Sequence, residues 1–266
     1  SELNIADPAD VEALMASRPW AAVINCAAYT AVDQAEVDPM SAWAANADGP
    51  AALAWACQTA QIPLIHISTD YVFDGETATT NLEIDPIAPL GVYGASKAAG
   101  ELAVRTFCPR HIILRTAWVV SAQGRNFART MLGLAQTRDH LQVVNDQTGN
   151  PTAAGDIADC VLAITERLLS DPDSPLGTYH FVNAGSASWF DLATHIFHQA
   201  EARGLKVPVL TPVSTEAYPT LSRRPKNSRL DTGRLTSDFG ITPRPWQVAV
   251  EEVVSTLLAD INPVRA

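Results

Sequence analysis

A tyrosine and a lysine stand four positions apart in the stretch VYGASKAAGE, residues 92–101. If this stretch begins a helix, Tyr93 and Lys97 lie on one face, because residues i and i+4 are neighbours on a helix. An ammonium group held near a phenol favours the phenolate and lowers the phenol pKa from about 10. The spacing therefore predicts a general acid or base that works near neutral pH. A solvated helix with a half-buried aromatic residue has the same spacing, so the rest of the chain must decide.

The composition is that of a globular chain with enough apolar residues for a core. The 266 residues, 47% of them hydrophobic, suit one large domain or two closely packed ones. A net charge of −11 argues against a nucleic-acid or anionic membrane surface, because both attract basic patches. The start of the chain, SELNIADPAD, has no basic or apolar leader, and no apolar run approaches about 18 residues. We therefore expect a cytoplasmic protein.

Neither the cysteines nor the histidines indicate a metal site. The four cysteines are far apart and form no CxxC motif, so they are expected to be buried, reduced thiols. They are Cys26, Cys57, Cys108 and Cys160. His195 and His198 stand three apart on an expected helix and could chelate a metal, but no third ligand accompanies them.

Short apolar runs alternate with helical segments over the first 116 residues. Strands are expected at 21–27, 63–68 and 111–116, and helices at 8–17, at 39–61 and from Tyr93 onwards. This alternation predicts an α/β fold, a doubly wound parallel sheet with right-handed crossovers. Ligands of such sheets bind beyond the carboxyl ends of the strands. The segments that follow the three runs are CAAYTAVD, STDYVFDG and AWVV.

The composition of the chain changes after about residue 120. Loops lengthen, prolines become denser, and arginines gather in SRRPKNSRLD, residues 222–231, which indicates a smaller substrate lobe. Ser188 and Asp191 have the spacing of a capping box, which predicts a helix to about residue 203, and a last helix is expected at 246–260. The expected first domain is 1–118 with a helix near 153–170, and the expected substrate lobe is 119–152 and 171–266.

Eight motifs, in order along the chain, resemble those of the dTDP-4-dehydrorhamnose reductases, which are extended short-chain dehydrogenases. They are CAAYTAVDQAE, STDYVF, YGASKAAGE, RTAWV, FARTML, NDQTGNPT, TYHFVNAG and RRPKNSRLDT. YxxxK alone indicates only a short-chain dehydrogenase, and the combination is far more specific. The resemblance implies reduction of the 4-keto group of dTDP-4-dehydro-6-deoxy-L-mannose to dTDP-L-rhamnose, with NADP or NAD as cofactor.

One motif of that family is missing from the sequence. A glycine-rich turn, GxxGxxG, should follow a first strand and bring the backbone to the cofactor pyrophosphate. The first residues instead resemble the third strand of the family, so about 35 residues of a βαβ unit are expected to be absent. The residue that selects NAD or NADP belongs to that segment, so the cofactor preference stays open.

The same resemblance assigns three residues to catalysis. Tyr93 donates a proton to the developing alkoxide, Lys97 lowers its pKa and bonds the nicotinamide ribose, and Thr69 hydrogen-bonds the reacting carbonyl. Tyr71 stands where related sugar dehydratases usually have a glutamate. A phenol cannot replace that carboxylate, so reduction is favoured over dehydration.

The resemblance also implies the binding residues. Those expected to contact the cofactor are Asn4, Ile5, Ala28, Tyr29, Thr30, Tyr93 and Lys97. Those expected to contact the sugar nucleotide are Thr69, Asp70, Trp118, Arg223 and Arg229. The basic cluster of Arg223, Arg224, Lys226 and Arg229 either faces the diphosphate, holds the substrate lobe together, or is a solvated loop. Some relatives use magnesium, although no carboxylate set for it is visible here, and a homodimer is compatible with the resemblance.

Two other functions share most of these motifs. An epimerase of the same superfamily would retain its cofactor without net redox change. A non-catalytic regulatory subunit would use the fold to bind another enzyme. The joint presence of Thr69, Tyr93 and Lys97 argues against the regulatory subunit, and the missing glycine-rich turn is the one feature that favours it.

Overall fold

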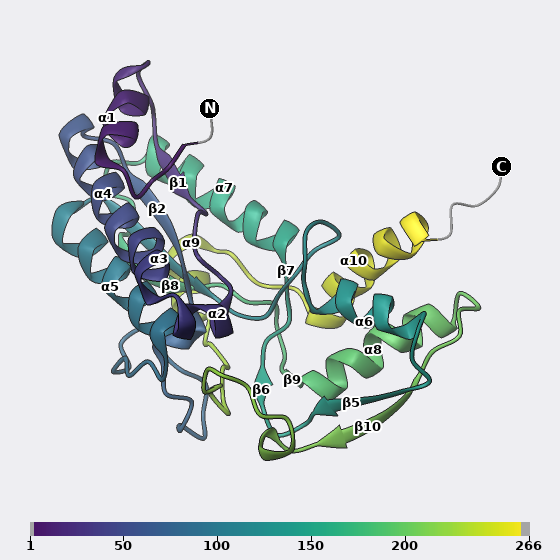
Figure 1. Cartoon of the computed structure of the whole chain (residues 1–266). Helices are drawn as coiled ribbons and strands as arrows, with labels where there is room; N and C mark the ends of the chain where they lie inside the picture. Colours follow the sequence, from purple (N-terminus) through teal and green to yellow (C-terminus); the bar gives the residue numbers. More distant parts are fainter. Residues whose placement is uncertain (1–2, 262–266) are drawn as a thin grey trace.

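A four-stranded parallel sheet forms the centre of the first lobe in the computed structural model, which describes residues 3–261 (Figure 1). Its strand order is β1-β2-β3-β8, and every neighbouring pair is parallel. The strands are β1 (Val23–Asn25), β2 (Leu64–Thr69), β3 (His111–Thr116) and β8 (Gly177–His180). The predicted doubly wound parallel sheet is confirmed.

Helices cover both faces of this sheet (Figure 1). On one face, Ile113 packs with the apolar side chains of α4 (Gly49–Ala60) and α5 (Val92–Phe107). On the other face, Ile112 and Leu114 pack with α7 (Ala154–Ser170) and α9 (Gly233–Phe239), because successive strand residues point to opposite faces. Full burial of one such aliphatic side chain contributes about 1.5–3 kcal/mol. A further helix, α1 (Pro8–Ala16), packs on α4 through Val11 and Leu53.

The second lobe has its own apolar core and a two-stranded parallel sheet (Figure 1). Its helices are α6 (Phe127–Ala135), α8 (Trp189–Glu201) and α10 (Trp246–Ile261), and its sheet pairs β5 (His140–Val144) with β10 (Val209–Val213). The predicted capping box at the start of α8 is confirmed, with Ser188 and Asp191 bonded reciprocally. Within residues 3–261, none of the helices has the length and apolar character that a membrane crossing requires.

The remaining strands and helical turns are short. Two small ladders join β4 (Val119–Val120) to β7 (Thr152–Ala153) and β6 (Thr148–Gly149) to β9 (Ala187–Ser188). The helical turns are α2 (Val32–Val37), α3 (Pro39–Trp43), the π-helix η1 (Ala44–Asp48), η2 (Asp70–Val72) and η3 (Thr215–Ala217).

The expected lobe boundaries need one correction. Residues 171–266 are expected in the substrate lobe, yet β8 pairs with β3 and α9 packs on the main sheet. Both elements therefore belong to the first lobe. Strand β8 is only four residues long and α9 seven, so neither gives a periodic pattern long enough to place it.

Three of the four cysteines are buried as expected, and Cys26 is exposed. Cys26 directly follows β1, where the chain leaves the sheet. Its exposure corrects the expectation that all four thiols belong to the core.

The helix expected at 39–61 runs without a gap to residue 60, and it contains the π-helical turn η1 between α3 and α4. The π-helical turn η1 inserts one residue into the ladder and brings the Asn46 carbonyl against α5. A Cβ atom at Gly100 of α5 would lie 2.1 Å from that carbonyl oxygen. Only glycine lets the two backbones approach this closely.

Gly100→Ala should therefore lower the free energy of unfolding by about 1–3 kcal/mol, because the added methyl group must displace backbone. Gly133→Ala in α6 is the matched control, since no atom of a neighbouring residue lies within 4 Å of the position that its Cβ would take. That exposed helical substitution should raise stability by roughly 0.5–1 kcal/mol. Urea unfolding of the three proteins measures both effects. Equal changes in the same direction would contradict the packing account.

Candidate active site

The predicted catalytic residues meet where α5 crosses the carboxyl end of β2. The Lys97 Nζ donates a hydrogen bond to the Ile67 carbonyl at 2.6 Å. The Tyr93 phenol lies close enough to the Thr69 hydroxyl for that hydroxyl to affect its pKa. Tyr93 and Lys97 are buried, and so is Thr69. The structure thus brings together the three residues that the sequence assigns to catalysis.

The pKa values of the pair differ from the expectation. Burial raises the pKa of the Tyr93 phenol well above its usual range, and Asp70 and Tyr71 raise it further. Burial lowers the pKa of Lys97 to about 8, while the Glu101 carboxylate opposes this change. The predicted lowering of the Tyr93 pKa by Lys97 is therefore wrong for this state, because the ammonium faces the Ile67 carbonyl and burial dominates. The phenol carries its proton at neutral pH.

Asp70 presents a buried carboxyl group beside Thr69. The Thr69 Oγ1 donates to Asp70 Oδ1 at 3.0 Å, and Oδ2 has no hydrogen-bond partner in the part of the chain that the structure describes. Burial raises the pKa of Asp70 to about 6, and the nearby Ser228 and Thr69 hydroxyls oppose this change. An unpaired buried oxygen at a strand end is suited to a polar ligand group.

Asn46 is a site residue that the sequence analysis missed. It is fully buried in η1 and makes a two-way hydrogen bond with the Tyr29 backbone, at 2.8 Å and 3.1 Å. Its Nδ2 also donates to Ser96 Oγ on α5 at 3.0 Å. Asn46 thereby fixes the loop after β1 against the catalytic helix. The available signal was an asparagine inside a predicted helix, a position where its side chain usually competes with the backbone.

The residues expected to contact the cofactor fall into two groups. Ala28 and Tyr29 are half-buried and Thr30 is exposed, all in the loop that leaves β1 at its carboxyl end. Ile5 instead packs in the core with Val11 and Leu53. Asn4 is exposed and caps its own turn, with its Oδ1 accepting from the Ala6 N–H at 3.2 Å.

A pocket of about 440 Å³ lies between the lobes, and Thr69, Tyr93 and Lys97 are not among the residues that line it. Tyr71, which packs edge-on against Tyr93 at 5.4 Å, lines it from the first lobe. Trp189 lines it from the second lobe and stacks on Trp118, with ring centroids 3.6 Å apart. Trp118 has φ +47°, a conformation that bulky residues adopt at a cost of about 1–3 kcal/mol. The predicted sugar-side tryptophan is thus held in a strained conformation behind the pocket wall.

One arginine of the predicted basic cluster reaches this pocket. Arg224 lines it, and its Nη2 donates to Asp33 Oδ2 at 2.7 Å. Arg229 instead holds the loop at 77–79, with its Nη2 donating to the Ala78 carbonyl at 2.6 Å. Arg223 is exposed. The structure therefore does not bring Arg223 or Arg229 to the pocket, and Arg224 occupies the position expected of them.

Of the two histidines expected on α8, His198 is exposed and His195 is held by an aromatic and a backbone contact. His195 packs edge-on against Trp246, and its Nε2 lies 3.2 Å from the Gln247 carbonyl. Among residues 3–261, no group of three His, Cys, Asp or Glu side chains is arranged to hold a metal ion.

Known proteins resemble this chain over nearly its whole length. The dTDP-4-dehydrorhamnose reductase of Aggregatibacter actinomycetemcomitans is 43% identical over 255 residues, which cover 95% of this chain and 87% of the relative. The crystal structure of a dTDP-4-dehydrorhamnose reductase from Clostridium acetobutylicum superposes with a TM-score of 0.88 at 37% identity, covering 96% of this chain and 88% of that one. The enzyme from Bacillus anthracis, solved in complex with NADP, has a TM-score of 0.87 at 36% identity and covers 94% and 86%.

The model of the family described as RmlD substrate binding domain matches residues 1–259. Fold, strand-end residues and sequence agree with this match, and the chain belongs to that family.

Proposed function

We propose that the protein reduces the 4-keto group of dTDP-4-dehydro-6-deoxy-L-mannose to give dTDP-L-rhamnose, with NADPH or NADH as the hydride source. The observation that carries the proposal is the meeting of Thr69, Tyr93 and Lys97 at one strand end, beside a pocket between two lobes. Relatives with 43% and 37% identity that bear the reductase name support it.

The residues at the carboxyl edge fit a pyridine nucleotide. The Lys97 ammonium has three N–H donors and, among the described residues, gives one to the Ile67 carbonyl, so two remain for ribose hydroxyls. Small side chains at Ala27 and Ala28 let a ligand approach the backbone after β1. When bound, the cofactor supplies the hydride. The relative from Bacillus anthracis, which was solved with NADP, supports the same assignment for this chain.

The protein groups supply the proton and the polarisation. Thr69 hydrogen-bonds the keto oxygen, and the Tyr93 hydroxyl gives its proton to that oxygen as negative charge develops. The raised pKa of Tyr93 suits this direction, because the phenol holds its proton until an alkoxide appears. Lys97 follows Tyr93 by one helical turn of α5 and is assigned to the nicotinamide ribose rather than to the proton transfer.

The substrate pocket suits a sugar nucleotide. Phe127 and Trp189 offer aromatic faces to a base, and Arg224 offers a guanidinium group to the diphosphate. The Arg224 Nη1 is buried without a hydrogen-bond partner among the described residues, so a phosphate oxygen could complete its bonding. Asp70 is proposed to contact the sugar.

Tyr71 favours reduction over the related reactions. It packs edge-on against Tyr93 as a phenol, and a phenol cannot replace the carboxyl group that water elimination needs as its acid. A sugar-nucleotide epimerase is the second candidate, and solved epimerases share the fold at 17–20% identity. Stoichiometric consumption of NADPH separates the two. A cytoplasmic location and a homodimer remain part of this proposal as predictions.

Tyr93→Phe should reduce kcat by about 10²- to 10⁴-fold, because it removes a positioned general acid while changing little volume. Steady-state oxidation of NADPH with the 4-keto sugar nucleotide measures the effect. Tyr179→Phe is the matched control, since Tyr179 is also buried but donates its hydrogen bond to Asp238, away from the pocket. Parental turnover by the Tyr93→Phe variant would refute the mechanism.

Arg224→Ala should raise KM for the sugar nucleotide by roughly 10- to 100-fold, as expected for a lost charge-assisted phosphate contact. KM for NADPH should change little. Arg203→Ala on α8 is the control, because Arg203 bonds Gln199 and Ser255 outside the pocket. An unchanged KM in the Arg224 variant would remove this residue from the diphosphate site.

A further inference from the structure

Three residues of α5 at successive turns contact three successive residues at the end of β2. The Tyr93 phenol lies near the Thr69 hydroxyl, and Lys97 donates to the Ile67 carbonyl. One turn further on, the Glu101 Oε1 accepts a hydrogen bond from Ser68 Oγ at 2.6 Å. Positions 93, 97 and 101 share one helix face because four residues make about one turn. Tyr93 and Lys97 are thus two of three residues on one face of α5 that lie against β2, and Glu101 is the third.

We propose, on the basis of the proposed function, that Glu101 is a positioning residue for Lys97 and Tyr93. Through its ion pair with Arg115, it fixes the height of α5 against β2. It also supplies a negative charge one helical turn from the Lys97 ammonium. Neither role requires contact with substrate or cofactor.

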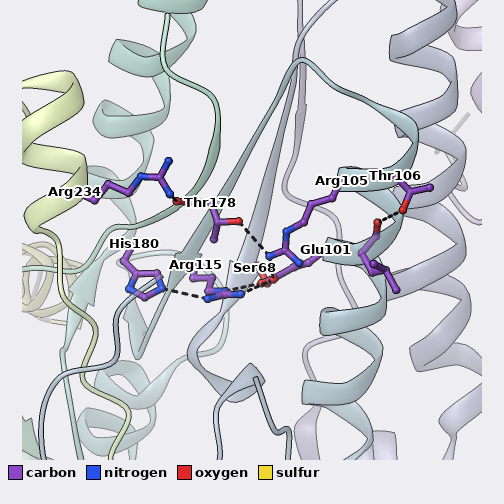
Figure 2. A network of polar contacts seen from close by, with 9 residues as sticks. Ser68, Glu101, Arg105, Thr106, Arg115, Thr178, His180 and Arg234 are labelled. Carbon is purple, nitrogen blue, oxygen red and sulfur yellow. Dashed lines mark hydrogen bonds and ion pairs between the residues drawn. The ribbon is translucent and has the colours of Figure 1, made fainter. Parts of the chain in front are cut away.

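The ion pair of Glu101 and Arg115 is buried, and both of its charged groups are hydrogen-bonded (Figure 2). The Glu101 and Arg115 side chains are 0% and 1% exposed. Arg115 donates two hydrogen bonds to the carboxylate, Nε to Oε1 at 2.8 Å and Nη2 to Oε2 at 2.7 Å. Arg105 adds a third charged donor to Oε2 at 2.7 Å. A forked pair of this kind allows one geometry only, so it can set a helix position to within a fraction of a turn.

The strand register ties this pair to the catalytic residues. Ser68 of β2 stands opposite Arg115 of β3, and Arg115 stands opposite His180 of β8. The next rung along is Thr69 opposite Thr116. Glu101 therefore contacts Ser68, the residue directly before Thr69 in β2. A small shift of the helix at this point would move the Tyr93 hydroxyl relative to Thr69.

The charges around Lys97 give Glu101 an electrostatic role as well. From its own helix Lys97 faces Glu101, and from the loop after β1 it faces the Cys26 thiol. His66 on β2 is uncharged at neutral pH, because burial and Lys97 hold its pKa well below its usual range. Arg115 on β3 is positive and is neutralised by Glu101. Removing the carboxylate would leave two buried cations, one of which can lose its proton near pH 8.

Direct titration of Lys97 tests the charge role without any substrate. The chain has only three lysines, Lys97, Lys206 and Lys226. With ¹³C-lysine labelling, the Lys97 signal is assigned by Lys206→Arg and Lys226→Arg, and its chemical shift is followed against pH. Glu101→Gln should lower the Lys97 pKa by about 1, a tenfold loss of proton affinity. Arg105→Gln is the matched control, because it removes a cation from the same carboxylate and should leave the pKa unchanged or higher.

A double variant, Glu101→Gln with Arg115→Met, tests the positioning role. It removes both buried charges, so it should fold, and the Lys97 pKa should stay near the parental value. The kcat should still fall at least tenfold with KM within about threefold, because misplaced catalytic groups lose rate rather than binding.

The outcomes are distinct from those that test the reaction itself. A Lys97 pKa that does not fall in Glu101→Gln, or a double variant with parental kcat, overturns the inference. So does loss of folding in both variants by circular dichroism, because the pair would then serve the fold as a whole. A parent chain without turnover would refute the proposed reaction instead, and the lysine titration would still decide the charge role.

Discussion

The contact between α5 and the carboxyl end of β2 is the interaction on which the site depends. The contacting groups belong to a helix and a strand, and the backbone hydrogen bonds of each element hold it in place. The Lys97 ammonium donates to a strand carbonyl, and the Tyr93 phenol lies near the hydroxyl of Thr69 at the strand end. Burial then controls the chemistry, since it raises the pKa of the phenol and lowers that of the amine.

Close backbone approach is the condition for that contact. A Cβ atom at Gly94 would lie 2.2 Å from the Tyr71 carbonyl oxygen, so glycine lets η2 pass directly beside Tyr93. On the neighbouring side, the π-turn presents Asn46, which bonds both α5 and the loop after β1. The catalytic helix is therefore held by backbone packing above the sheet and by the Glu101–Arg115 pair within it.

The sequence predicts the parts of this arrangement that repeat with a period. Strands β2 and β3 and helix α5 follow from apolar runs and from the i, i+4 spacing, and they are confirmed within one residue. The π-turn does not follow, because one inserted residue leaves the helical pattern of 39–61 nearly unchanged. Arg224 could not be separated from Arg223 in an irregular loop, where only the packing against Asp33 decides which side chain turns inward. The predicted lowering of the Tyr93 pKa was wrong, because the spacing of two residues carries no information about their burial.

The central claim is that a hydride and a proton reach the keto sugar at this strand end. Isotope transfer is the most direct test of that claim. The protein is supplied with NADPH carrying deuterium at the reactive C4 position and with the dTDP-linked 4-keto sugar, and the product is examined by NMR. The account predicts one deuterium at C4 of the sugar for each NADPH consumed. A converted sugar without deuterium, with NADPH unchanged in amount, would contradict it.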